Sequence, residues 1–177
     1  GLGDVYKRQE FPINIEVTDG NDVYYTTDGS DPTQNSAVYS GSIPMPLGKS
    51  TFRFIRIAEG RKSDIVEKSY NLVMNTDFMP EDAVKKVVNH AIQSGKISEE
   101  SGSFDESGAA YLYQYQYVTN INKIDDFYVI AEIYRGEDGT DTKTGNLFAV
   151  NAYNQELYKL QVDESGRRYT LVAVSDI

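Results

Sequence analysis

The spacing of apolar and polar residues predicts a first group of β-strands in the amino-terminal part of the chain. Residues 23–26 alternate between the two faces of a half-buried strand. Further on, Phe52 and Phe54 share one face, whereas Ile55 and Ile57 fall on the face of the arginine between them, which is typical of a central strand covered on both sides. The expected strands are residues 12–18, 22–27, 51–58 and 64–73, with short edge pieces around 37–46.

After a linker at residues 74–79, the spacing of the apolar residues changes from that of a strand to that of a helix. Pro80 suits the first position of a helix, and Gly95 suits its end. The apolar residues at the spacing of one buried helix face are Val84, Val87, Val88, Ala91 and Ile92. The sequence therefore predicts a helix over residues 80–94.

A second group of alternating segments follows a polar stretch at residues 96–110. The expected strands are residues 111–119, 127–135, 146–151, 156–162 and 168–174. The expected turns are Asp125-Asp126, residues 137–145, residues 153–155 and residues 164–166. One helix followed by an antiparallel meander predicts an α+β layer pair with the helix across the sheet. The hairpin from Leu147 to Leu160 is similar to those of cystatin-like or PepSY-like folds, although Asn154-Gln155-Glu156 replaces their usual Thr-Gly-Glu turn.

A dense turn follows the strand at residues 22–27. Asp28-Gly29 is a turn pair in which glycine takes positive φ without steric cost, and Pro32 fixes a second bend. The turn motif consists of Tyr25, Thr27, Asp28, Gly29, Ser30, Pro32 and Thr33. Asp28, Ser30 and Thr33 can bond backbone N–H groups that the turn leaves unpaired. Their oxygens could hold calcium, but the spacing matches no calcium loop, so we interpret the motif as structural.

Together with Tyr39, Ile43-Pro44, Ser63-Asp64 and Tyr70, this motif resembles the chitobiase/β-hexosaminidase C-terminal domain over residues 11–72. That resemblance implies an immunoglobulin- or fibronectin-like β-sandwich. In the family, this domain is an appendage of bacterial surface and secreted proteins and is not the part that cleaves sugar. The resemblance therefore implies an extracellular or cell-envelope location.

These observations predict a mainly β chain in which an Ig-like β-sandwich precedes a helix packed on an antiparallel sheet. We expect residues 1–9 to be a non-native leader, because they carry no periodic pattern and have no signal-peptide layout. We expect the sandwich over residues 10–73 and the α+β domain over residues 78–177, both as a fragment of a longer protein.

The charge distribution bears on the partners to be expected. The net charge is −10, and residues 74–177 hold nine Lys or Arg against seventeen Asp or Glu. Binding to nucleic acid or to anionic membrane surfaces relies on clustered Lys and Arg, so both partners are disfavoured. No apolar run reaches the roughly 18 residues of a membrane span. Cysteine is absent, which excludes disulfides and thiolate-bound zinc.

Candidate chemistry is sparse. His90 is the only histidine, and alone it cannot form a His-based metal site or a catalytic triad, so we expect a boundary or exposed residue. The carboxylate pairs Glu99-Glu100, Asp105-Glu106 and Asp125-Asp126 fall in predicted loops, and residues 137–141 offer at most a loose cation loop. We expect no catalytic residue, no metal and no cofactor.

Four alternate tyrosines form the other unusual feature. In strand period, Tyr111, Tyr113, Tyr115 and Tyr117 share one face, opposite Leu112, Gln114, Gln116 and Val118. That face is either a stacking platform for a sugar or a protein partner, or an inner face packed under the helix. We favour the second interpretation, in which Tyr113 and Tyr115 pack towards the helix.

The sequence as a whole predicts a non-catalytic accessory, spacer or protein-interaction fragment of a larger bacterial cell-envelope or secreted protein. Its partners would be other domains of the parent protein, and a cell-surface glycan or protein. The alternative is a carbohydrate-binding accessory module of a glycan-active surface protein, which the absence of tryptophan weakens.

Overall fold

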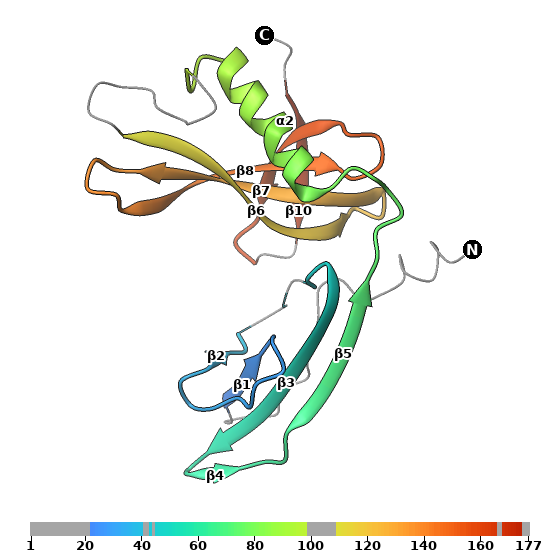
Figure 1. Cartoon of the computed structure of the whole chain (residues 1–177), viewed down its shortest axis with the longest axis vertical. Helices are drawn as coiled ribbons and strands as arrows, with labels where there is room; N and C mark the ends of the chain where they lie inside the picture. Colours follow the sequence, from blue (N-terminus) through green and yellow to red (C-terminus); the bar gives the residue numbers. More distant parts are fainter. Residues whose placement is uncertain (1–21, 41–42, 44, 99–108, 166–167, 175–177) are drawn as a thin grey trace. The chain divides into compact units, whose positions relative to one another are not determined.

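The computed structural model describes residues 22–40, 43, 45–98, 109–165 and 168–174 (Figure 1). The chain divides into two compact units, residues 1–75 and 76–177. Within the described residues there are two antiparallel sheets and one helix, so the predicted mainly β fold class is confirmed. The expected leader at residues 1–9 and the expected strand at residues 12–18 lie outside the described residues.

The sheet of the first unit is organised around its longest strand, β3. Its strands are β1 (Asp22–Thr26), β2 (Ala37–Val38), β3 (Gly48–Ala58), β4 (Arg61–Lys62) and β5 (Val66–Leu72). β1 pairs with one edge of β3, and β4 and β5 pair with the other edge. β2 extends the sheet beyond β1.

Both faces of β3 are buried, as its pattern predicts. Phe52 on one face is fully buried, and Ile55 on the other is 6% exposed. The Phe52 ring meets the edge of the Tyr70 ring at 5.6 Å between centroids, and Phe54 lies 6.1 Å from Tyr25 on β1. These aromatic contacts across strands fix the register of the sheet.

The strand predicted over residues 64–73 is confirmed as β5, and the short strand β4, which was not predicted, precedes it on the same edge of the sheet. Ser63 lies between the two strands: the Ser63 N–H donates to the Arg56 carbonyl at 2.9 Å, and the Ser63 hydroxyl oxygen accepts the Arg56 N–H at 2.9 Å. A serine side chain here replaces a ladder carbonyl, which lets the strand bend without losing a backbone bond.

The turn after β1 is held by its own side chains. The Asp28 carboxylate accepts hydrogen bonds from the Ser30 N–H at 3.0 Å and from the Ser30 hydroxyl at 2.6 Å. These two bonds, the hydroxyl bond first, hold the pKa of Asp28 below its ordinary value. Gly29 has φ of +83° and donates its N–H to the Thr51 carbonyl at 3.0 Å, so its backbone joins the turn to β3.

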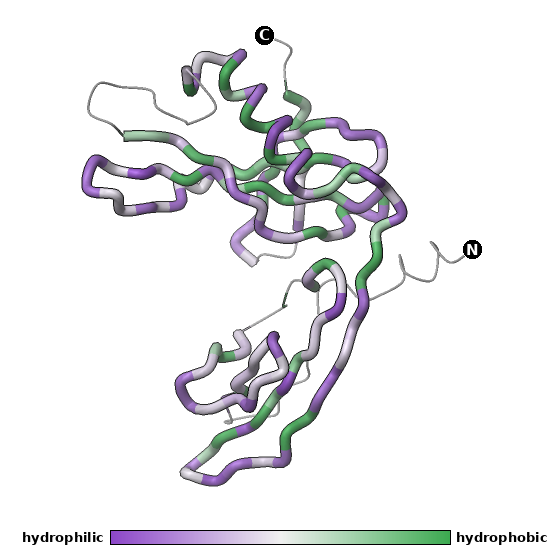
Figure 2. Tube along the Cα trace, viewed as in Figure 1, coloured by the Kyte–Doolittle hydropathy of each residue, from purple (hydrophilic) through white to green (hydrophobic). Residues whose placement is uncertain are grey.

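The second unit is a helix on a five-stranded meander. Its elements are α2 (Pro80–Gln93), β6 (Ala110–Ile121), β7 (Asp125–Arg135), β8 (Asp141–Asn151), β9 (Leu157–Val162) and β10 (Tyr169–Ala173). The strands are ordered β10-β9-β8-β7-β6, so each pairs with its neighbour in sequence. Apolar and polar segments alternate along α2, whereas the tip of the β7–β8 hairpin is hydrophilic (Figure 2).

The ends of α2 lie where the sequence places them. The Met79 N–H donates to the Asp82 carboxylate at 2.9 Å, which satisfies a donor just before the first turn. At the other end, Gly95 has φ of +78° and the Lys96 N–H bonds back to the Ala91 carbonyl. The fully buried face runs through Ala83, Val87 and Ala91, while Val84, Val88 and Ile92 of the predicted stripe flank it as half-buried residues.

The sheet of the second unit is apolar on both faces because it curls. On the face away from α2, the buried cluster is Ile121, Phe127, Val129, Ala149 and Leu160. The outer strands β6 and β10 approach each other over this cluster: the Asn122 amide donates to the Tyr169 carbonyl at 3.3 Å, and the Tyr117 and Tyr169 hydroxyls are hydrogen-bonded. Consequently β7 is buried on both sides from Asp126 to Ile133.

The prediction that four tyrosines share one face is wrong, because β6 contains a bulge. Tyr115 pairs with Ile130 but Tyr117 pairs with Val129, so Gln116 is an extra residue. Tyr113 and Tyr115 lie on the face that α2 covers, where their rings contact Phe148 and Tyr128. Tyr117 instead packs against the buried cluster on the opposite face.

The predicted Asp125-Asp126 turn is also wrong. The chain reverses at Asn122 and Lys123, which have φ of 55° and 59°, and both aspartates belong to β7. Asp126 is only 3% exposed, and its carboxylate accepts hydrogen bonds from the Tyr153 hydroxyl at 3.1 Å and from the Asn120 amide at 3.3 Å. Asparagine tolerates the left-handed conformation, which is why the turn forms earlier than the acidic pair.

We predict that Asp28→Asn lowers the melting temperature of the first unit at pH 7, and that Asp28→Ala lowers it further. A lowered folded-state pKa means that the charged carboxylate stabilises the fold above its unfolded pKa, and that this contribution disappears as pH falls through the folded value. Thermal unfolding at pH 7 and at pH 2.5 measures both effects. A wild-type advantage over Asp28→Asn that is as large at pH 2.5 as at pH 7, or a loss of stability on adding a calcium chelator, would contradict this prediction.

Candidate functional site

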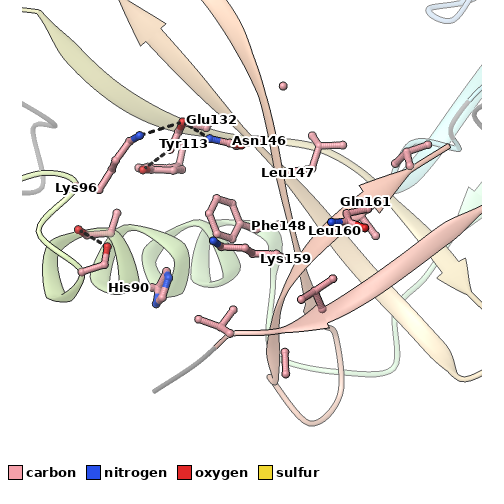
Figure 3. A pocket seen from close by; sticks show the side chains of 17 residues that line it. His90, Lys96, Tyr113, Glu132, Asn146, Leu147, Phe148, Lys159, Leu160 and Gln161 are labelled. Carbon is pink, nitrogen blue, oxygen red and sulfur yellow. Dashed lines mark hydrogen bonds and ion pairs between the residues drawn. The ribbon is translucent and has the colours of Figure 1, made fainter. Parts of the chain in front are cut away.

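A buried carboxylate, that of Glu132 on β7, is the centre of the polar structure in the second unit. Its side chain is 3% exposed and points to the face that α2 covers. The carboxylate accepts hydrogen bonds from the Tyr113 hydroxyl at 2.8 Å and from the Asn146 amide at 2.9 Å (Figure 3). It also accepts one from the Thr144 hydroxyl at 2.9 Å. Three neutral donors thus replace the water that burial removes.

A bulge in β8 supplies two of these donors. Ala131 pairs with Leu147 and Ile133 pairs with Lys143, so three residues of β8 lie opposite Glu132 alone. Gly145, in the middle of these three, has φ of +90°, a conformation that residues with a Cβ rarely adopt. The bulge turns Thr144 and Asn146 towards the same carboxylate oxygen.

Lys96, just after α2, gives the carboxylate a counter-charge. Its ammonium nitrogen lies 3.9 Å from Glu132 Oε1 and 4.1 Å from the centre of the Tyr111 ring. The aromatic face therefore helps to hold the cation near the carboxylate. Burial, and next the hydrogen bond to Glu132, raise the pKa of Tyr113, so its hydroxyl stays protonated and remains a donor.

An open hollow of about 850 Å³ lies beside this network, bounded by the second half of α2 and by β7 to β10. Glu132, Tyr113 and Asn146 form one end, and Lys159 on β9 and His90 on α2 line the rest (Figure 3). The helix lies mainly over β6 and β7, and the hollow extends beside it over β9 and β10.

His90 is a boundary residue, as its position on the helix predicts. Its ring meets the ring of Phe148 at 6.1 Å, and Phe148 in turn meets Tyr113 at 6.0 Å. Burial lowers the pKa of His90, and the positive charge of Lys159 lowers it further. His90 is therefore neutral at pH 7. Phe148 is 7% exposed, so its ring has no open face for stacking.

The other residues singled out in the sequence lie elsewhere. The turn motif belongs to the first unit, where Thr27 is exposed, Pro32 is buried, and the Thr33 hydroxyl oxygen accepts the Asn35 N–H at 3.2 Å. In the β7–β8 loop, the Asp138 carboxylate accepts a hydrogen bond from the Thr140 N–H. Arg135, at the end of β7, forms a bidentate ion pair with Asp141, at the start of β8. Glu99-Glu100 and Asp105-Glu106 lie outside the described residues.

Sequence reasoning missed the Glu132 network. One signal could have found it: Glu132 is the single charge in the apolar run from Phe127 to Ile133, which has the character of a strand buried on both faces. A charge in such a strand requires partners, because an unpaired buried carboxylate is too costly. The positions of those partners on β6 and β8 depend on bulges that no local pattern reveals.

No group of three or more His, Cys, Asp or Glu side chains in the described ranges is placed to hold a metal ion. Across the same ranges, no helix combines the length and the apolar character needed to cross a membrane.

Comparison with known proteins identifies part of the first unit. Residues 13–70 match the model of a family described as Fn3 associated, which supports a fibronectin-like domain there. This match covers the turn motif and most of the segment with the chitobiase-like pattern. No curated protein and no solved structure matches the chain.

We predict that Tyr113→Ala lowers the free energy of unfolding of the second unit by roughly 3–5 kcal/mol, the range for a buried aromatic ring. Tyr113→Phe keeps the ring and should cost about 1–3 kcal/mol, because it leaves the buried carboxylate without one donor. Urea unfolding followed by near-ultraviolet circular dichroism measures both. A Tyr113→Phe variant as stable as wild type would show that the carboxylate does not need this bond.

Proposed function

We propose that the chain is a non-catalytic accessory and protein-interaction portion of a larger bacterial cell-envelope or secreted protein. In this proposal the first unit is a spacer of the chitobiase/β-hexosaminidase C-terminal kind, and the second unit is the interacting part. The Fn3-associated match over residues 13–70 supports the first assignment, because the resembling domain is an appendage and not a catalytic centre.

One observation carries the non-catalytic part of the proposal. The buried carboxylates of the second unit are bonded within the fold: Glu132 accepts three hydrogen bonds from neutral side chains, and Asp126 accepts two. A general acid or base must reach a proton on a substrate. In this proposal, carboxylates occupied in this way stabilise the sheet and do not act as a general acid or base, although Glu132 borders the hollow beside α2.

The helix and meander of the second unit also support a cystatin-like or PepSY-like class for it, the class that its Leu147–Leu160 hairpin resembles. We propose an extracellular or cell-envelope location on the resemblance of the first unit. The complete gene of the parent protein tests that location, since it should encode an export signal or a surface anchor.

A panel of chromogenic glycosides and a set of immobilised polysaccharides test the function of the purified chain. We expect no turnover above the buffer blank and no retention on the polysaccharides. Turnover that a Glu132→Gln or Asp126→Asn substitution abolishes in a folded variant would refute the non-catalytic role. Retention on one polysaccharide would instead establish the alternative, a carbohydrate-binding accessory module.

A further inference from the structure

The hollow beside α2 differs in charge from the rest of the chain. The chain has a net charge of −10, yet the charged groups lining the hollow are Lys96, Lys159 and Glu132. Lys96 lies 3.9 Å from Glu132 and balances its charge. One positive charge is left over, that of Lys159, which is exposed and makes no ion pair in the described part of the chain.

The hollow ends at a fork where two strands separate, and one apolar side chain is exposed in it. β8 and β9 pair only from Leu147–Leu160 to Val150–Leu157, because the bulge that holds Glu132 turns the first half of β8 away towards β7. Leu147, Leu160 and Val162 border the hollow at this fork, but their side chains pack with the buried cluster of the other face, so the exposed apolar side chain of the hollow is Val172 on β10, at 39%. Val172 and Lys159 together give the hollow an exposed apolar side chain beside a positive charge, so its surface can contact both apolar and acidic groups.

We propose that this hollow binds an extended peptide segment of a partner protein, one that carries an Asp or Glu beside apolar residues. This inference rests on the proposed interaction function and names its site. The acidic side chain pairs with Lys159, and an adjacent apolar side chain packs on Val172, which lies opposite Lys159 in the β9–β10 pair. The positive charge of Lys159 favours peptide segments that carry a carboxylate over segments that lack one.

The lining argues for a peptide over a sugar. Sugar sites commonly offer an open aromatic face for stacking, and the aromatic rings of this hollow are covered: Phe148 is 7% exposed between His90 and Tyr113, and Tyr113 is 9% exposed. A volume of about 850 Å³ accommodates several side chains of an extended segment. Gln161, exposed on β9 in the lining, offers a donor and an acceptor for a peptide backbone.

Selection from a library of random nonapeptides displayed on phage, with the purified chain as target, tests this proposal. We expect the enriched sequences to contain Asp or Glu next to Val, Leu, Ile or Phe. Fluorescence anisotropy with the most enriched peptide then gives Kd for wild type and variants. Lys159→Met should raise Kd about tenfold or more, the loss expected for a charge-assisted contact, and this effect should shrink in high salt.

Two variants serve as matched controls. Lys159→Arg keeps the charge and should bind within about twofold of wild type, and Lys85→Met removes an exposed charge on α2 outside the hollow and should do the same. Lys159 is exposed, so its variants should fold, and their melting temperatures check this.

The outcomes separate this site from the proposed function. A selected peptide whose Kd responds equally to Lys159→Met and Lys85→Met overturns the hollow as the site and leaves an interaction role standing. No enrichment, or enrichment of basic sequences, overturns the peptide proposal. Binding of an oligogalacturonate that Lys159→Met abolishes, with no peptide selected, assigns the hollow to an acidic glycan and overturns both this proposal and the primary function.

Discussion

The burial of one carboxylate constrains most of the second unit. Removing Glu132 from water is costly unless its oxygens are bonded, and in this fold β6, β8 and the segment after α2 each provide a partner. To provide two of these partners, β8 places residues 144–146 opposite Glu132 alone, and Gly145 in their middle has φ of +90°. The same bulge turns β8 away from β9 and creates the fork that lines the hollow.

A second constraint is that β7, an interior strand of the sheet, is covered on both faces. α2 covers one side of β7, and the curling of the sheet brings β6 and β10 together over the other side. Polar groups on β7 are therefore used within the fold, as the partners of Glu132 and Asp126 illustrate. The groups left for a ligand lie at the rim, on β9 and β10, where Lys159 and Val172 are exposed.

Local signals made most elements predictable from the sequence. Proline at residue 80 and glycine at residue 95 place α2 to within one residue, and alternation locates β6, β7, β9 and β10. The expected strand at 146–151 and the expected turn at 137–145 are wrong in extent, because β8 begins at Asp141 and pairs with β7 on both sides of its bulge. The prediction from alternation failed at Gln116, because the bulge there depends on how β6 pairs with its neighbouring strand and leaves no local sequence pattern. It also could not show which donors meet Glu132, since those bonds join residues 12 to 19 positions apart.

A double-mutant cycle between Tyr113→Phe and Glu132→Ala tests the central claim most directly. Native-state hydrogen exchange of the β6 and β7 amides gives the free energy of opening of this unit alone. If the carboxylate holds β6 through the Tyr113 hydroxyl, the two substitutions should be coupled by at least about 1 kcal/mol. Additivity within about 0.5 kcal/mol would show that the bond is not formed in solution, and the structure would then not depend on it.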